Sequence, residues 1–201
     1  MHSGKLQIID PKSTYIDEEA EVGEGTVIYP NTTILGKVKI GKNCEIGPNS
    51  VIQDSKIGDF CVIFFSVVKN SEISNNVDIG PFSHLRGQVV IAEGVHIGNY
   101  VEMVRTKVGK NTKIGHVTYL GDTEVFENVN IGAGTITANY DGKVKNKTVI
   151  ESDVFIGADT TLVAPVKVDK GAKTGAGAVV IEDVPENTLV VGVPAQVKKK
   201  I

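Results

Sequence analysis

The sequence predicts an all-β protein, a parallel β-helix built from hexapeptide repeats, and two observations support this. The first is composition: of 201 residues, 41% are hydrophobic, only 5% are aromatic, and 22 are glycine. Branched aliphatic side chains with frequent glycines favour strands joined by tight corners over helix bundles. The second is a recurring Ile-Gly or Val-Gly pair, found from Val22-Gly23 to Ile156-Gly157.

The repeat has a period of six residues, with a few steps of five. Its first series is Ile16, Val22, Ile28, Ile34, Ile40, Ile46 and Ile52. Six residues match neither the 3.6-residue turn of an α-helix nor the alternation of a long strand. The period fits coils of three short strands, with one aliphatic side chain per side pointing to the axis. At a strand spacing of roughly 4.8 Å, residues 16–180 give about nine coils and a prism on the order of 43 Å long.

Three segments lie outside this period. Residues 1–15 are predicted as a lead-in to the β-helix domain at 16–180, and residues 181–201 as a C-terminal cap. A short helical cap could form over residues 181–186, although Pro185 limits its length. Residues 138–148 carry no aliphatic anchor and contain an Asn-Tyr-Asp-Gly turn signal, so they are predicted to leave the prism as a loop.

Charge and composition narrow the possible functions. The net charge of −3 gives no basic excess for nucleic acid or an anionic membrane. No apolar run approaches the roughly 20 residues that span a bilayer, and residues 1–12 lack the pattern of a secretory signal. Cys44 and Cys61 are too few for a disulfide framework or a zinc cage. The sequence therefore predicts a cytoplasmic protein.

Stacking places distant residues side by side. Ile97, Ile114 and Ile131 lie three steps apart, so they share a column, and His116 falls between Asn99 and Ala133 on neighbouring coils. A second column contains Leu85, Met103 and Leu120. The polar residues that flank these columns within three adjacent coils are Arg86, Glu102, Arg105, Tyr119 and Asn130.

The residue types in this band are suited to proton transfer and to binding a sugar phosphate. Histidine can accept a proton near neutral pH, and Glu102 could hold the ring of His116 in one tautomer. Arginine and lysine side chains bind phosphate, and tyrosine and asparagine bind sugar hydroxyls. Residues that could take these roles are Arg86, Arg105, Lys145, Tyr119 and Asn130. On spacing alone, a set of solvated residues on the faces of the prism is the favoured interpretation.

Three strings carry a family resemblance: "GPFSHLRGQ" at 80–88, "VEMVRTKVGKNTKIGHVTYLGD" at 101–122 and "VNIGAGTITANYDGKVKNKT" at 129–148. They resemble the C-terminal domain of the bifunctional N-acetylglucosamine-1-phosphate uridyltransferase / glucosamine-1-phosphate N-acetyltransferase, over about residues 8–180. The resemblance implies a left-handed β-helix and a homotrimer with sites between subunits. It also implies acetyl transfer from acetyl-CoA to the amine of glucosamine 1-phosphate, which supplies UDP-N-acetylglucosamine, with no metal required.

The resemblance also implies residue roles. His116 matches the general base, and a backbone N–H near Ala133–Gly134 could hold the oxyanion. Positions that match sugar-phosphate contacts are Arg86, Tyr119, Asn130 and Lys145. Positions that match the acetyl-CoA channel are Ala133, Asn139, Tyr140, Ala158 and Ala176. Glu102 as the partner of His116 is our own hypothesis.

The sequence departs from the family pattern in three places. Val104 stands where the family has a lysine, so one phosphate contact is lost unless Arg105 replaces it. "VGVPA" at 191–195 lacks the family's arginine before Val-Pro, which affects a contact to coenzyme A. Residues 1–15 contain no glycine-rich nucleotide loop, so the resemblance covers one of the family's two domains.

These departures leave alternatives open. The acceptor could be another amino sugar, including a nucleotide-linked one. A γ-type carbonic anhydrase would need three histidines, and although His84, His96 and His116 are available, the His-x₄-His pair of that family is missing. A non-catalytic relative that serves as a scaffold or binding module is a third reading.

Overall fold

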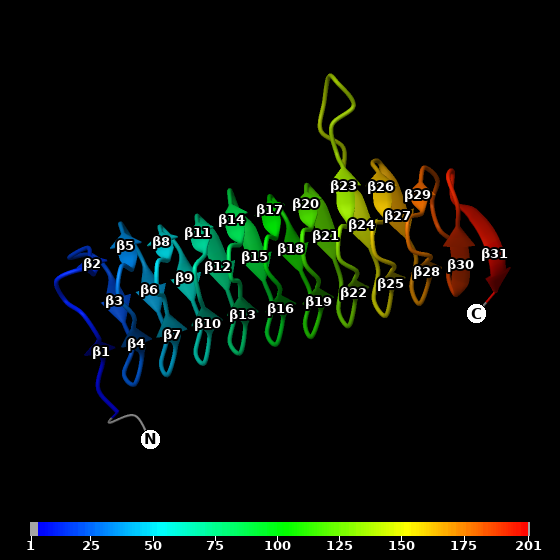
Figure 1. The fold of residues 1–201 in the computed structure, drawn as a ribbon. Coiled ribbons are helices and arrows are strands. Elements are labelled where there is room, and N and C mark those ends of the chain that lie inside the picture. The colour runs from blue at the N-terminus through cyan, green and yellow to red at the C-terminus, as the bar shows by residue number, and fades with distance from the viewer. Residues whose placement is uncertain (1–3, 201) are drawn as a thin grey trace.

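The computed structural model describes residues 4–200, which wind into a left-handed β-helix of about 10 turns (Figure 1). Three sheets run along the prism, with 12, 10 and 9 strands, and we call them sheets A, B and C. Successive strands visit the three sheets in rotation, so neighbours within a sheet are parallel and come from successive coils. The predicted all-β, left-handed parallel β-helix is therefore confirmed.

The strands are short because each side of a coil is only a few residues long. Sheet A contains β1 (Gln7–Ile8), β4 (Val27–Ile28), β7 (Glu45–Ile46), β10 (Val62–Ile63), β13 (Asp78–Ile79), β16 (His96–Ile97), β19 (Lys113–Ile114), β22 (Asn130–Ile131), β25 (Phe155–Ile156), β28 (Lys173–Thr174), β30 (Thr188–Val191) and β31 (Gln196–Lys200). Sheet B contains β2 (Tyr15–Ile16), β5 (Thr33–Leu35), β8 (Val51–Gln53), β11 (Val67–Lys69), β14 (His84–Arg86), β17 (Glu102–Val104), β20 (Tyr119–Gly121), β23 (Ile136–Ala138), β26 (Thr161–Val163) and β29 (Val179–Val180). Sheet C contains β3 (Glu21–Val22), β6 (Lys39–Ile40), β9 (Lys56–Ile57), β12 (Ser71–Ile73), β15 (Val89–Ile91), β18 (Lys107–Val108), β21 (Thr123–Val125), β24 (Thr148–Ile150) and β27 (Val166–Val168).

The hydrophobic core is one continuous cluster along the axis of the prism. The six-residue ladder supplies it: Ile97, Ile114 and Ile131 pair in register and are fully buried. Leu85, Met103 and Leu120 form the equivalent column on sheet B and are also buried. Because side chains alternate across a strand, the residues beside each anchor face outward. These outward residues are the ones that can form a site.

The corner between sheets A and B carries an unusual set of apolar residues. Phe65, Phe82, Tyr100 and Val117 occupy it on successive coils, all with positive φ and all exposed. Positive φ is rare for bulky or β-branched residues. The ring centroids lie 5.6 Å apart for Phe65 and Phe82, and 5.3 Å apart for Phe82 and Tyr100. We call these four residues the corner ladder.

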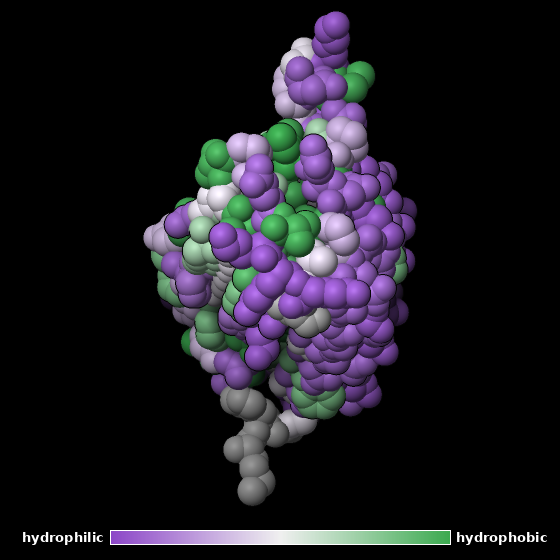
Figure 2. Space-filling model, turned by 90° about the vertical axis from the view of Figure 1, so that its right-hand side faces the viewer, coloured by the Kyte–Doolittle hydropathy of each residue, from purple (hydrophilic) through white to green (hydrophobic). Residues whose placement is uncertain are grey.

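Within residues 4–200, one loop leaves the prism between β23 and β24, at residues 139–147, and confirms the loop that the sequence predicts at 138–148 (Figure 1). Figure 2, which looks at the C-terminal end of the prism, shows it standing clear of the body. Asp141 holds the loop together, because its carboxylate accepts hydrogen bonds from the backbone N–H groups of Lys143 and Val144 and from the Asn146 side chain.

The two ends differ from the sequence-based expectation. The prediction of a helical cap at 181–186 is wrong. Those residues contain no helix, and Val184 forms a β-bridge to Val168. The cap is instead a strand, since β31 folds back antiparallel on β30 and covers the last coil. At the other end β1 already pairs with β4, ahead of residue 16. Within residues 4–200, no helix has the length and apolar character needed to cross a membrane.

Candidate active site

His116 lies in a column of small residues at the corner between sheets A and B. Backbone hydrogen bonds fix the column: the N–H of Val117 donates to Asn99 O at 3.0 Å, and the N–H of Gly134 donates to His116 O at 2.8 Å. The N–H groups of residues 159 and 177 donate to Ala133 O and Ala158 O in the same way, at 2.7 and 2.8 Å. The column therefore consists of Asn99, His116, Ala133, Ala158 and Ala176. His116 lies between Asn99 and Ala133, where stacking predicts it.

The imidazole of His116 rests against Gly98 on the preceding coil. Its Nδ1 is only 2.9 Å from the position that a Cβ on Gly98 would take. The absence of a side chain at Gly98 is therefore what lets the ring pack against this corner. His116 as a whole is exposed, so the ring is accessible to a substrate.

Three alanines continue the column from His116 toward the C-terminal end. Ala133 and Ala158 are half-buried and Ala176 is exposed. Three coils at the strand spacing make a strip about 14 Å long that presents methyl groups and backbone. Such a strip can accommodate an extended chain such as the pantetheine arm of coenzyme A.

The outward face of sheet B holds a second set of residues. His84, Glu102 and Tyr119 are in register, as stacking predicts. The Nε and one terminal N–H₂ of Arg86 donate to Glu102 Oε1 at 2.9 and 2.6 Å. Burial lowers the pKa of His84 below its usual value.

Glu102 is paired with another residue in this structure. Its carboxylate is paired with Arg86, and among residues 4–200 no hydrogen bond joins Glu102 to His116. The physical reason is position: Glu102 faces out from the strand of sheet B, whereas His116 lies at the corner against Gly98. The orienting role of Glu102 stays a hypothesis.

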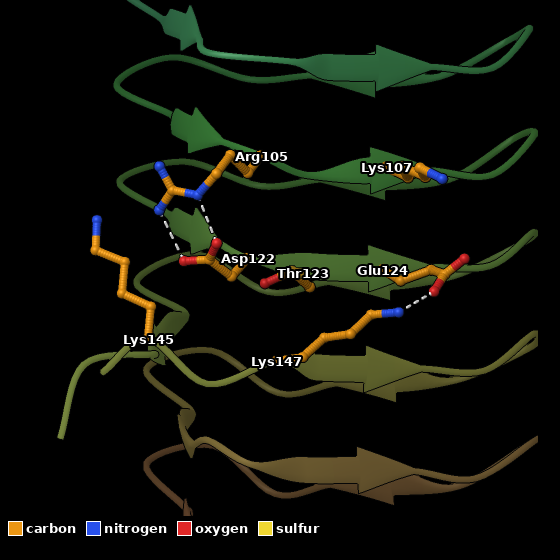
Figure 3. A pocket seen from close by; sticks show the side chains of 7 residues that line it. All are labelled: Arg105, Lys107, Asp122, Thr123, Glu124, Lys145 and Lys147. Atoms are coloured by element: carbon orange, nitrogen blue, oxygen red, sulfur yellow. Dashed lines mark hydrogen bonds and ion pairs between the residues drawn. The ribbon is translucent and has the colours of Figure 1, made fainter. Parts of the chain in front are cut away.

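The corner between sheets B and C is charged. Arg105 donates from Nε and from one terminal nitrogen to the two carboxylate oxygens of Asp122, at 2.6 and 2.8 Å. Figure 3 shows this pair beside Lys145, along the wall of a cavity of about 270 Å³. The cavity is lined by Arg105, Lys107, Asp122, Thr123, Glu124, Lys145 and Lys147. Its four cations and two carboxylates make it suited to an anion.

Tyr119 and Asn139 meet above Gly121. The Tyr119 hydroxyl and the Asn139 amide nitrogen each lie 2.5 Å from the position of a Cβ on Gly121, so any side chain there would displace both. Asn139 also donates to Asp122 Oδ2 at 2.6 Å. Sequence reasoning missed Gly121 and Asp122, although both stand in the "GHVTYLGD" string that drew attention to Tyr119.

The remaining predicted residues lie elsewhere. Asn130 faces outward from sheet A, between Lys113 and Phe155. Tyr140 is an exposed residue of the loop, and its hydroxyl donates to Gly142 O at 2.8 Å. Asn130 is therefore one face away from Tyr119, although both were expected to contact a sugar.

The predicted residues thus form two groups, one at the corner between sheets A and B and one that extends from the outward face of sheet B to its corner with sheet C. The corner group is His116, Ala133, Ala158 and Ala176, with Asn130 beside it on sheet A. The sheet-B group is Arg86, Glu102, Arg105, Tyr119, Asn139 and Lys145. His116 and Asp122 are six residues apart, which corresponds to at most about 20 Å of extended chain.

The three described histidines do not converge. His84 is on sheet B and His116 at the corner, while His96 on sheet A is 2.5 Å from Asp78 Oδ2. Over residues 4–200, no group of three or more His, Cys, Asp or Glu side chains is arranged to hold a metal ion.

The fold and the small-residue column define the class: a left-handed β-helix of hexapeptide repeats. Solved structures share this fold, including an Arabidopsis UDP-N-acetylglucosamine acyltransferase with a TM-score of 0.85 at 20% identity, covering 96% of this chain and 74% of that one. A galactoside acetyltransferase in complex with coenzyme A has a TM-score of 0.52 at 20% identity, covering 55% of this chain and 64% of that one. A family model described as "GMPPB C-terminal domain" matches residues 11–108.

Curated relatives give the particular family. Bifunctional protein GlmU of Caldicellulosiruptor saccharolyticus is 53% identical over 97% of this chain and 42% of the relative, and that of Carboxydothermus hydrogenoformans is 50% identical over 97% and 44%. The protein of the same name from Thermotoga maritima is 49% identical over 97% and 44%. The chain belongs to this family and corresponds to its C-terminal region, which confirms the resemblance drawn from the motifs. It spans about two fifths of the length of these relatives.

Proposed function

We propose that the chain is an acetyl-CoA-dependent N-acetyltransferase that acetylates the amine of glucosamine 1-phosphate, a step toward UDP-N-acetylglucosamine. One observation carries the proposal: an exposed histidine stands at the head of a methyl-lined strip, where an acyl chain could end beside a base. Family membership supports the same activity.

Acetyl-CoA, when bound, would supply a thioester carbonyl to the attacking amine. The residues of the strip fit its pantetheine arm, because Ala133, Ala158 and Ala176 leave room along the corner. His116 then accepts the proton that the attacking amine loses. The N–H of Gly134 is already bonded to His116 O, so the Ala133 N–H is the better candidate for the oxyanion donor.

The acceptor's phosphate belongs with the sheet-B group. Arg105 and Lys145 line the same cavity, and the cavity's surplus of positive charge favours a phosphate. Tyr119 places a hydroxyl next to it for a sugar contact, and Asn139, which the resemblance assigns to acetyl-CoA, lies beside that hydroxyl. Val104 is 2% exposed and apolar, so it makes no phosphate contact.

A homotrimer with sites between protomers would bring the two groups together. In one protomer His116 lies at the corner between sheets A and B, and Arg105 lies at the corner between sheets B and C. Asn130 also faces a different sheet from Tyr119. The exposed corner ladder beside His116 supports an interface at this corner, since exposed apolar patches mark contact surfaces. A cytoplasmic location without nucleic-acid or membrane partners stays a prediction.

A second acceptor class follows from the cavity itself. It extends beyond Lys145 to Lys107 and Lys147, so a longer anion than a monophosphate would also find cations there. An amino sugar linked to a nucleoside diphosphate is therefore the runner-up acceptor.

An acetyl-transfer assay tests both acceptor classes. Thiol release from acetyl-CoA is followed with glucosamine 1-phosphate and with a panel of free, phosphorylated and nucleotide-linked amino sugars. We expect the highest kcat/KM for glucosamine 1-phosphate. A higher value for a nucleotide-linked sugar would select the second class, and no release with any amine would favour a non-catalytic relative.

A further inference from the structure

The carboxylate of Asp122 joins three consecutive coils at the corner between sheets B and C. It accepts two hydrogen bonds from Arg105 on the preceding coil, at 2.6 and 2.8 Å, and one from Asn139 on the following coil, at 2.6 Å. Asn139 is the first residue of the loop after β23. One carboxylate therefore fixes both a cation of the candidate phosphate site and the base of the loop.

The pairing leaves part of Arg105 available for a ligand. A guanidinium carries five N–H donors, and Asp122 engages Nε and only one of the two terminal nitrogens. Figure 3 shows the third nitrogen on the side away from Asp122. Asp122 thus holds the guanidinium plane in one orientation and leaves one terminal nitrogen for another acceptor.

This arrangement differs from the ordinary ion pairs on the prism. Lys56 and Glu72 on sheet C form one contact of 3.1 Å, with side chains 71% and 62% exposed. The Asp122 side chain is 20% exposed and accepts three hydrogen bonds of 2.8 Å or less. Arg105 also lowers the pKa of Asp122, so the carboxylate is charged at neutral pH. A solvent-exposed pair contributes little, whereas a shielded, multiply bonded carboxylate can fix a geometry.

We propose that Asp122 is a positioning residue, which orients Arg105 toward the phosphate of the acceptor and anchors the loop at Asn139. The effect of Asp122 on the kinetics of acetyl transfer rests on the proposed function. Its effect on anion binding does not, because Arg105 would contact any phosphate that enters the cavity.

Kinetics give the first test. For Asp122→Ala we expect the acceptor KM to rise about 10- to 100-fold, the usual range for losing hydrogen bonds to a charged group, while kcat changes less than about 3-fold. If Asp122 acts through Arg105, the double variant Arg105→Ala/Asp122→Ala should bind the acceptor no worse than Arg105→Ala alone. Glu72→Gln is the matched control, and it should leave both constants unchanged.

Direct binding gives the second test and separates this inference from the proposed function. Inorganic phosphate is titrated into the wild-type protein and into Asp122→Asn, which preserves the size of the side chain, with heat as the readout. We expect about a 10-fold or greater rise in Kd for the variant. A wild type that binds phosphate in this way but acetylates no glucosamine 1-phosphate would refute the proposed function and leave the role of Asp122 standing.

Three results would overturn the inference. These are equal phosphate affinity in wild type and Asp122→Asn, fully additive effects of the Arg105 and Asp122 substitutions, or no phosphate binding by the wild type. If Asp122→Ala does not fold, Asp122→Asn replaces it in the kinetic series.

Discussion

At the scale of single residues, the position of the His116 imidazole depends on the small size of the neighbouring residues. Gly98 leaves space for the ring, and small residues on the following coils leave space for a ligand. Stacking arithmetic located His116 in its column, but the contact with Gly98 depends on the direction of the side chain. The geometry of the candidate site therefore depends on the glycine and the alanines around His116 as much as on the histidine itself.

Replacing His116 tests its role as the base. We expect His116→Ala to lower kcat by about 10²- to 10⁴-fold, the usual value of general-base catalysis, with the fold intact. His96→Gln is the control, because that ring is paired with Asp78 on sheet A. Steady-state acetylation assays measure both, and near-normal turnover by His116→Ala would refute the assignment.

Replacing Gly98 tests the packing of the ring. A methyl group at Gly98 would lie 2.9 Å from His116 Nδ1 and 3.3 Å from the backbone oxygen of Ile114, so we expect Gly98→Ala to displace the ring and lower kcat with a small loss of thermal stability. The contrast is Gly109→Ala, where the methyl group would meet backbone atoms of Phe126 and Glu127 at 2.5 and 2.7 Å. Backbone cannot move aside as a ring can, so Gly109→Ala should lower Tm. Equal loss of Tm in both variants would contradict this.

At the scale of elements, each coil is stabilised by the aliphatic side chains that it stacks on its neighbours. Ile114 is fully buried between Ile97 and Ile131. We expect Ile114→Ala to lower the free energy of unfolding by about 2–5 kcal/mol, through lost burial and a cavity. Ile181, which is 50% exposed, is the matched position, and its alanine variant should change stability by no more than about 0.5 kcal/mol. Denaturant unfolding measures both, and similar losses would contradict the stacking account.

The link between coils at Asp122 should depend on pH. Arg105 lowers the pKa of Asp122 in the folded protein, so near pH 4 the unfolded chain binds more protons than the native one. The stabilisation is complete above the unfolded pKa of about 3.9 and is lost as the pH falls through the lower folded value. The difference in unfolding free energy between wild type and Asp122→Asn should therefore be constant near neutrality and shrink below about pH 4. Parallel pH profiles for the two proteins would argue against this pairing.

At the scale of the whole molecule, the proposed homotrimer would build each site from two protomers, because His116 and Arg105 lie at different corners of the prism. Mixing two inactive variants tests this. His116→Ala and Arg105→Ala protomers that are unfolded together and refolded should regain activity at about one quarter of the sites, if each site takes one group from each of two protomers. Light scattering should give three times the mass of one chain.

The control mixture combines His116→Ala with Asn130→Ala. Both residues belong to the corner group, so the same protomer would supply both to a site. Every protomer in that mixture lacks either His116 or Asn130. No site would therefore contain both side chains, and activity should not return. Recovery in the control, or none in the first mixture, would argue against sites shared in this way.

The sequence by itself determined the period of six, and with it the coil to which each residue belongs, the inward or outward direction of its side chain and the position of the loop. These follow from local geometry, because every anchor repeats the same turn. The tertiary structure decided what adjacent outward side chains do: Glu102 pairs with Arg86, Asp122 joins Arg105 to Asn139, and a strand, not a helix, caps the last coil. Such choices depend on side-chain rotamers and on competition among several nearby partners in three dimensions, which a one-dimensional period does not encode.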